Sequence, residues 1–220
     1  MADCPFYRPA VKNERSLYTL LVPRVSDEHL AARRQQILDA ARRCFLRDGF
    51  HNTSMQDVIA EAGLSVGAVY RYFPSKNDLI TSIAQSVIGG ADEVFAELVA
   101  VEPPLPLVEA LDRALSYVDT QAGPDGVLPL AIQVWSETQR DPALAEFVKA
   151  TYAGFRRHFA ALVRRAQQVG EVPADADPEA VGAALFALVP GYFMQRILTG
   201  APDRHTYLAG VRTLLARPAR

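Results

Sequence analysis

The chain has 220 residues, of which half are hydrophobic and 22% are charged, so it can bury a substantial core in one or two domains. Its formal net charge is -2 and its pI is near 6.1, which argues against a basic protein that binds nucleic acid without sequence preference. It contains no uninterrupted run of about 18 apolar residues and no signal peptide, so we expect a cytoplasmic protein with no membrane partner.

The beginning of the chain has no helical or strand periodicity and contains three prolines, so we expect a disordered arm over 1–23. Two alternatives remain open. The arm contacts DNA through Arg8, Lys12 and Arg15, or it arises from an upstream start codon and residues 1–21 do not belong to the native protein.

A first helix is predicted to begin after Ser26, because a serine cap followed by Asp27 and Glu28 suits the positive end of a helix. Apolar side chains at helical spacing then lead toward Gly49: Leu30, Ile37, Leu38, Ala41 and Phe45. We expect this helix to brace the segment that follows. Cys44 lies on it, and we interpret Cys44 as a small buried apolar residue, with a redox sensor as the alternative.

The stretch from Thr53 to Lys76 predicts a helix, a tight turn and a second helix. Thr53 and Gln56 fit a capping box at the start of a helix over about 54–62. Gly63 can adopt the left-handed conformation that ends this helix.

The second helix is predicted to be short, because Ser65 caps it and Pro74 ends it, which leaves residues 66–72. Val69 and Phe73 are four residues apart and are expected to face inward. The opposite face then presents mostly small side chains: Ser65, Val66, Gly67, Ala68 and Arg71.

We predict that this outward face enters a DNA major groove, which is roughly 12 Å wide. Arg71 is expected to donate two hydrogen bonds to a guanine, while Tyr70, Tyr72 and Lys76 reach phosphates, and Thr53 belongs to the same predicted DNA-binding set. Basic residues gather in or near this part of the chain: Arg33, Arg34, Arg42, Arg43, Arg47, Arg71 and Lys76. A solvated helix face is the alternative interpretation for about half of them.

The segment GLSVGAVYRYFPSKNDL resembles the TetR family of bacterial one-component regulators, whose pattern is Gly, apolar, Ser, x, Gly, x, apolar, Tyr, x, aromatic or His, Phe, x, x, Lys. The motif match extends over roughly Ser26 to Leu79, and the rest of the chain is similar only in its helical layout. The resemblance implies an all-α protein, in which an N-terminal three-helix DNA-binding domain with a helix-turn-helix precedes a C-terminal helical ligand-binding and dimerisation domain. We accordingly expect these parts: arm 1–23, DNA-binding domain 24–75, ligand-binding and dimerisation domain 76–216, and tail 217–220.

Ser75 and Asp78 form a second predicted capping box, which starts a long helix at about Lys76. We expect Gly89-Gly90 to interrupt this helix. A ligand-driven tilt at this point and a bend without a signalling role are both open. The later helices are predicted from their caps, prolines and apolar spacing: one beginning at Leu107, one ending near Arg140, one opened by Asp141-Pro142, one over about 178–198 and one over about 203–216.

The stretch AVGAALFALVPGYFMQRIL is apolar almost all round, so we expect it to be buried on most sides. A second copy of the chain can provide part of that burial, and we predict a two-fold homodimer through the last two helices, with a monomer as the alternative. The predicted interface residues are Ala184, Leu188, Tyr192, Arg196, Tyr207 and Val211.

Aromatic residues from four predicted helices are interpreted either as the lining of a ligand pocket or as ordinary core. The family resemblance favours a pocket for an apolar ligand, formed by Tyr117, Trp135, Tyr152, Phe155, Phe159, Phe186 and Phe193. Gln133 and Glu137 flank Trp135, and each is expected either to orient the ligand or to lie on the surface.

The histidines lie far apart, at His29, His51, His158 and His205. None has a partner at metal-ligand or catalytic spacing, and the sequence has no glycine-rich phosphate loop, so we expect no enzyme, no metal and no cofactor. The favoured hypothesis is a sequence-specific regulator, a repressor that leaves a palindromic double-stranded DNA operator when a small, largely apolar effector binds. A transcriptional activator and a nonspecific architectural DNA-binding protein are the alternatives.

Overall fold

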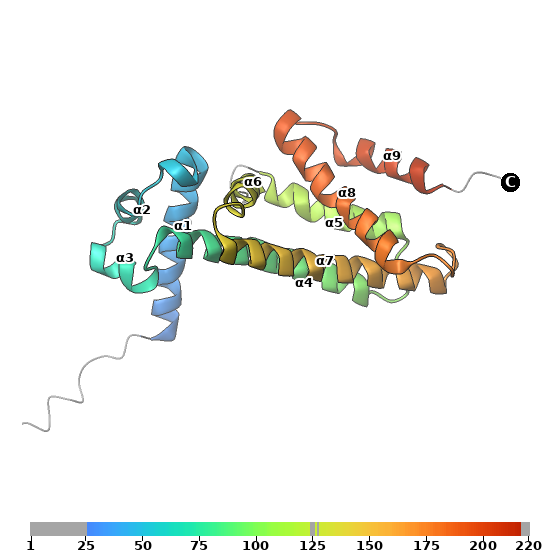
Figure 1. The fold of residues 1–220 in the computed structure, drawn as a ribbon, viewed down its shortest axis with the longest axis horizontal. Helices are drawn as coiled ribbons and strands as arrows, with labels where there is room; N and C mark the ends of the chain where they lie inside the picture. The colour runs from blue at the N-terminus through green and yellow to red at the C-terminus, as the bar shows by residue number, and fades with distance from the viewer. Residues whose placement is uncertain (1–25, 124–125, 127, 217–220) are drawn as a thin grey trace, which may run out of the picture.

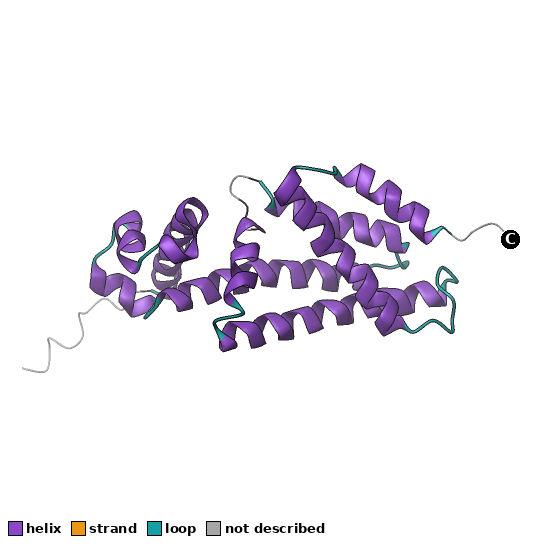
Figure 2. Ribbon diagram, turned by 45° about the horizontal axis from the view of Figure 1, so that its top comes forward, coloured by secondary structure: helices purple, strands orange, loops and turns teal. Residues whose placement is uncertain are grey.

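The structure is a computed structural model that describes residues 26–123, 126 and 128–216. The predicted arm, with Arg8, Lys12 and Arg15, and the tail 217–220 lie outside the described residues. The regular structure of the described part is entirely helical, which confirms the all-α prediction (Figure 2). Its helices are α1 Asp27–Asn52, α2 Met55–Ala62, α3 Val66–Tyr72, α4 Lys76–Ala100, α5 Leu107–Gln121, α6 Leu128–Glu137, α7 Pro142–Gln168, α8 Pro178–Thr199 and α9 Arg204–Leu215.

The helices are arranged in two groups that α4 connects (Figure 1). Helices α1, α2 and α3 gather at one end, α5, α8 and α9 lie toward the other, and α4 runs alongside α7. Two hydrophobic cores correspond to these groups. The core around α1 to α3 also includes Leu130 and Val134 from α6 and Leu144 from α7, so the C-terminal helices take part in packing the N-terminal ones.

The helix starts follow their caps, with one correction. Ser26, Asp141 and Asp203 each accept a hydrogen bond from a backbone N–H of the helix that follows, as expected from the sequence. The predicted capping box of Thr53 and Gln56 is wrong by one residue. Ser54 is the cap of α2, and its partner is Asp57, whose carboxylate accepts from the Ser54 backbone N–H at 2.8 Å.

Helix α4 is continuous through Gly89 and Gly90, so the predicted interruption is wrong. The packing gives Gly90 a different role. A Cβ atom at position 90 would lie 2.5 Å from the hydroxyl oxygen of Tyr117 on α5, whereas a Cβ at position 89 would meet no atom within 4 Å. Gly90 therefore provides the space into which the Tyr117 side chain fits.

Helix α8 crosses α7 closely at another glycine. A Cβ atom at Gly182 would lie 2.6 Å from the backbone nitrogen of Ala160. The middle of α8 is buried through Phe186, Val189 and Phe193. By length and composition α8 would be able to cross a membrane, a test that the core helix of a soluble protein also passes.

Candidate DNA-binding surface and ligand cavity

Helix α3 spans Val66–Tyr72, the bounds predicted from the sequence. Val69 is fully buried and Phe73 is 2% exposed, so these two side chains anchor α3 to the core as expected. The structure places other residues of the predicted DNA-binding set on the surface: Ser65, Val66, Gly67, Tyr70 and Arg71. Ala68 and Tyr72 are half-buried.

Two residues expected to contact DNA make hydrogen bonds inside the protein. Thr53 is only 1% exposed, and its hydroxyl donates to the carbonyl oxygen of Gly49 at 2.8 Å. The Lys76 ammonium donates to the carbonyl oxygens of Phe50 at 2.6 Å and Thr53 at 3.1 Å. These contacts satisfy carbonyl groups where α1 ends and the link to α2 begins, so both residues position the DNA-binding helices.

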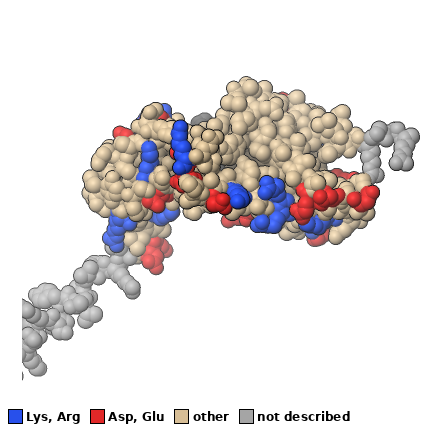
Figure 3. Space-filling model, in the orientation of Figure 1, with Lys and Arg blue, Asp and Glu red and all other residues tan. Residues whose placement is uncertain are grey.

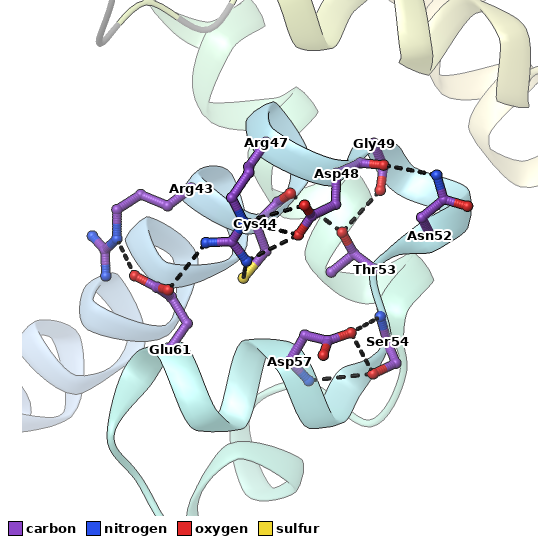
Figure 4. Close-up of polar contacts among 10 residues, drawn as sticks. All are labelled: Arg43, Cys44, Arg47, Asp48, Gly49, Asn52, Thr53, Ser54, Asp57 and Glu61. Carbon is purple, nitrogen blue, oxygen red and sulfur yellow. Dashed lines mark hydrogen bonds and ion pairs between the residues drawn. The ribbon is translucent and has the colours of Figure 1, made fainter.

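The arginines of α1 contact other helices of this group. Figure 4 shows Arg43 and Arg47 directed at Glu61 on α2, with the Arg43 Nε atom 2.7 Å and the Arg47 Nη1 atom 3.5 Å from its carboxylate oxygens. The hydrogen bond from Arg43 is the main reason that the pKa of Glu61 lies below its usual range. These ion pairs join α1 to α2.

Arg34 and Arg42 make contacts inside the protein, whereas Arg71 on α3 is exposed. Arg34 donates to the Ser82 hydroxyl at 3.0 Å and lies over the Phe73 ring, while Arg42 contacts Ser86. Within the described part of the chain, Arg71 makes no hydrogen bond or ion pair, and its side chain is exposed on α3. Its guanidinium is therefore available to a ligand such as DNA.

A cavity of about 130 Å³ lies between α4, α5, α6, α7 and α8. Of the aromatic residues predicted for the pocket, all but Phe159 line it: Tyr117, Trp135, Tyr152, Phe155, Phe186 and Phe193. Phe159 is instead packed in the core, with its ring centre 5.3 Å from that of Phe95 and 5.6 Å from that of Phe186.

Aliphatic residues of the wall were missed by the sequence analysis, because an aliphatic residue in a helix gives no signal that distinguishes a cavity from a core. They include Ile83 and Ile88 from α4, Leu128 and Leu130 from α6, and Val189 from α8. No charged side chain occurs among the described lining residues.

Polar groups in the cavity wall are few and neutral. Burial raises the pKa of the Tyr117 and Tyr152 hydroxyls, so both stay protonated near neutral pH. Gln121 supplies an amide. A cavity of this kind favours a neutral, mostly apolar molecule with few hydrogen-bonding groups.

Gln133 and Glu137 of α6 do not line the cavity, and instead contact the end of α1. The Gln133 side-chain oxygen accepts from the Phe50 N–H at 2.7 Å, and its nitrogen donates to the Phe45 carbonyl at 3.3 Å. The Glu137 carboxylate lies 2.9 Å from Nε2 of His51. One side of α6 thus faces the cavity and another is bonded to the DNA-binding helices.

The predicted dimer residues divide between surface and interior. Tyr192 is fully buried, with its hydroxyl donating to the Asp119 carboxylate at 2.7 Å, and Val211 is 4% exposed, so the expectation that these two lie at an interface is wrong. Their side chains face the core because they lie on the inner sides of α8 and α9. Ala184 is exposed, and Leu188, Arg196 and Tyr207 are half-buried.

Two further features of the described part of the chain concern metal-binding side chains and the environment of Cys44. The described residues contain no group of His, Cys, Asp and Glu that could hold a metal ion. Cys44 is fully buried on α1, and burial raises the pKa of its thiol, as the interpretation of an apolar core residue requires.

Models of two protein families match the chain. "Bacterial regulatory proteins, tetR family" matches residues 37–83, and "BetI-type transcriptional repressor, C-terminal" matches residues 108–219. The chain is 25% identical to the HTH-type transcriptional regulator UidR of Escherichia coli over 183 residues, 83% of this chain and 90% of that protein. A shorter match, 42% identical over 64 residues, covers 29% of this chain and 34% of the HTH-type transcriptional repressor Rv1474c of Mycobacterium tuberculosis.

Solved structures share the fold over most of the chain. GusR of Salmonella enterica superposes with a TM-score of 0.71 at 28% identity, over 87% of this chain and 96% of that one. A putative transcriptional regulator from Saccharomonospora viridis in complex with choline superposes with a TM-score of 0.68 at 25% identity, over 84% of this chain and 96% of that one.

Proposed function

Because the chain belongs to the TetR family of bacterial regulatory proteins and is a DNA-binding transcriptional regulator, we propose that it is a repressor released from its operator by a small, largely apolar molecule. The observation that carries the proposal is the placement of α6. This helix lines, on one side, a cavity whose described lining residues are all uncharged, and it is hydrogen-bonded to α1 on another. A molecule that fills the cavity therefore acts directly on a helix bonded to the DNA-binding part.

The DNA-binding surface is the exposed face of α3. Its leading residues Ser65, Val66 and Gly67 are small or short, which permits close approach to base edges, and Arg71 is exposed and makes no hydrogen bond or ion pair with the described residues. Arg71 is assigned to base recognition, and Tyr70 to a phosphate contact. Specificity beyond Arg71 comes from backbone approach and from the shape of the DNA.

A homodimer is proposed to present two such helices to a palindromic operator. The exposed side of α8 and α9 carries Ala184 together with the large apolar side chains of Leu198 and Leu214, which are 68% and 81% exposed. Figure 3 shows few charged side chains over the part of the molecule where Figure 1 places α8 and α9, whereas charges gather along α4 and α7. A second copy of this face would cover these apolar side chains.

The effector is proposed to be neutral and about the size of a single aromatic ring with small substituents. An apolar protein cavity of roughly 150 Å³ is large enough to hold benzene, and the cavity here, about 130 Å³, is of similar size. The aromatic lining also suits a small quaternary ammonium ion through cation–π contacts, and the structure from Saccharomonospora viridis contains choline. We place the neutral ligand first because no carboxylate occurs among the described residues that line the cavity.

Release from DNA requires that the effector bind the non-DNA-binding conformation more tightly than the DNA-binding one. We assign the transmission to α6. A shift of this helix is passed to the last turn of α1 through Gln133, whose two hydrogen bonds hold the backbone of Phe45 and Phe50. Phe50 in turn accepts from Lys76 at the start of α4, so the displacement reaches both supports of the helix-turn-helix.

The proposal is tested by fluorescence anisotropy of labelled DNA fragments that flank the gene for this protein, with unrelated competitor DNA at physiological salt. We expect tight binding of two protomers per operator and loss of binding when a single-ring aromatic molecule is added. Choline is titrated in parallel and distinguishes the cationic alternative. The proposal is contradicted if competitor DNA removes the protein completely from every fragment and from every sequence recovered in a genome-wide selection.

A further inference from the structure

A shallow hollow on the protein surface adjoins the cavity where α6, α7 and α8 meet. The hollow is lined by Trp135, Thr138, Val148, Tyr152, Pro190, Gly191 and Met194. Of these residues, Trp135, Val148, Tyr152 and Pro190 also line the cavity. The two spaces are thus separated by side chains that belong to both linings.

Two of the four shared residues, Trp135 and Tyr152, are aromatic, and they lie at the border of the core. Trp135 and Tyr152 are half-buried, whereas Phe186 behind them is 7% exposed. Burial raises the pKa of the Tyr152 hydroxyl, and its interaction with the Trp135 side chain opposes this effect. The Trp135 ring also meets Phe193 edge to face at 5.4 Å, and the Tyr152 ring meets Phe186 at 5.3 Å.

Opening this wall requires little rearrangement. If the Trp135 and Tyr152 side chains rotate apart, three ring contacts are lost, that of Trp135 with Phe193 and those of Tyr152 with Phe155 and Phe186, while the helices keep their backbone hydrogen bonds. On the outer side, Gly191 has no side chain to obstruct the passage, and Met194 is a flexible thioether. Side-chain rotations of this kind are far faster than the movement of whole helices.

We propose that the effector enters and leaves the cavity through this hollow, and that Trp135 and Tyr152 form the gate between the two spaces. The inference rests on the proposed function, because it takes the cavity to be the effector site. The gate also contributes to specificity. Flat molecules pass between the two rotated rings, whereas branched molecules of equal volume are excluded before they reach the cavity.

Met194 provides the decisive test because it lines the hollow and not the cavity. A bulkier residue at position 194 raises the free-energy barrier to both entry and exit of the ligand. It leaves the free energy of the bound state unchanged. We expect Met194→Trp to slow association and dissociation about tenfold each, with the same Kd, and Met194→Ala to accelerate both. Gln195→Trp is the matched control, since Gln195 is exposed on the same helix and is absent from both linings, and it should leave the rates unchanged.

The rates are measured on the full-length protein with fluorobenzene as the probe, by 19F exchange NMR, which gives Kd and the dissociation rate together.

A second variant acts on the gate itself. Tyr152→Phe removes the hydroxyl that interacts with Trp135 and keeps the ring, so dissociation should become about fivefold faster, equivalent to about 1 kcal/mol. Thermal unfolding of each variant confirms that it is folded.

The outcomes separate the gate from the cavity. If fluorobenzene binds but Met194→Trp leaves both rates as they are, the gate is wrong and the cavity stands as a ligand site. If Met194→Trp changes Kd without changing the association rate, Met194 contacts the ligand and the gate is again overturned. If fluorobenzene does not bind to the unmodified protein, the ligand assignment and the gate fail together.

Discussion

The ammonium nitrogen of Lys76 lies 2.6 Å from the carbonyl oxygen of Phe50, and this hydrogen bond ties the start of α4 to the last turn of α1. The C-terminal carbonyl groups of a helix lack partners within the helix and carry partial negative charge, so a cation there is favourable. Three helices meet at this point, because the neighbouring Thr53 carbonyl, just before α2, accepts from the same ammonium at 3.1 Å.

Replacing Lys76 by Met should keep the aliphatic stem and remove both hydrogen bonds. We expect the free energy of unfolding to fall by about 1.5–3 kcal/mol, the range for hydrogen bonds to a charged group. Urea denaturation measures the change. Lys149→Met is the control, because Lys149 forms an exposed ion pair with Glu146 and should change stability by less than about 0.5 kcal/mol. Equal effects of the two substitutions would show that the Lys76 bonds do not stabilise the fold.

Arg71→Ala should weaken operator binding by about 1–3 kcal/mol if the guanidinium reads a base. The loss should disappear for operators altered at the contacted base pair, and Arg71→Lys should not restore binding because lysine lacks the planar fork. Anisotropy titrations against single-base operator variants measure both effects. A loss that is the same on every sequence would assign Arg71 to a phosphate.

The adjacent glycines of α4 provide a matched pair of substitutions. Gly89→Ala should stabilise the protein by up to about 1 kcal/mol, because position 89 has free space and alanine favours the helix. Gly90→Ala should not, since its Cβ would lie 2.5 Å from the Tyr117 hydroxyl and would push that side chain toward the cavity. Thermal unfolding and fluorobenzene affinity measure the two effects. A gain of stability in both variants would mean that Tyr117 moves away without cost.

Gln133→Leu should leave ligand affinity nearly unchanged, because Gln133 does not line the cavity, and should weaken ligand-induced release of DNA. The substitution leaves the Phe50 N–H without its acceptor, so we also expect a stability loss of about 1–3 kcal/mol. DNA affinity with and without ligand gives the coupling free energy. Gln139→Leu, at an exposed position just after α6, is the control. If the coupling free energy of Gln133→Leu equals that of the unmodified protein, Gln133 does not transmit the effect of the ligand to the DNA-binding helices.

Acid should loosen the contact between α1 and α2. The pKa of Glu61 is lowered chiefly by its hydrogen bond with Arg43, so the folded state binds the proton less readily than the unfolded chain. The stability from this pair is therefore complete above the unfolded pKa, about 4.3, and is lost as the pH falls through the lower folded value. Urea midpoints measured between about pH 5 and pH 3 should fall less steeply in Glu61→Gln. If the urea midpoint falls equally steeply with pH in Glu61→Gln and in the unmodified protein, the Glu61–Arg43 pair does not cause the loss of stability in acid.

Local features of the sequence were sufficient to predict most of the helices. Ser65 and Pro74 defined α3 to the residue, and Asp141 marked the start of α7, because a cap acts on N–H groups within three residues of itself. The inward positions of Val69 and Phe73 followed from helical spacing alone. The family motif indicated α3 as the helix proposed to bind DNA for the same reason, since all of its residues lie on one short helix and its flanks.

The tertiary structure decided what the same side chains contact. Lys76 reaches Phe50 across 26 positions and Gln133 reaches it across 83, and no local pattern distinguishes such partners from solvent. Tyr192 lies on an apolar helix, and only the packing of α5 against α8 shows that its hydroxyl meets Asp119 inside the protomer. Short-range hydrogen bonds and periodicity fix the helices, whereas burial and long-range partners depend on how the helices pack, and that packing determines which residues remain available for DNA and for a ligand.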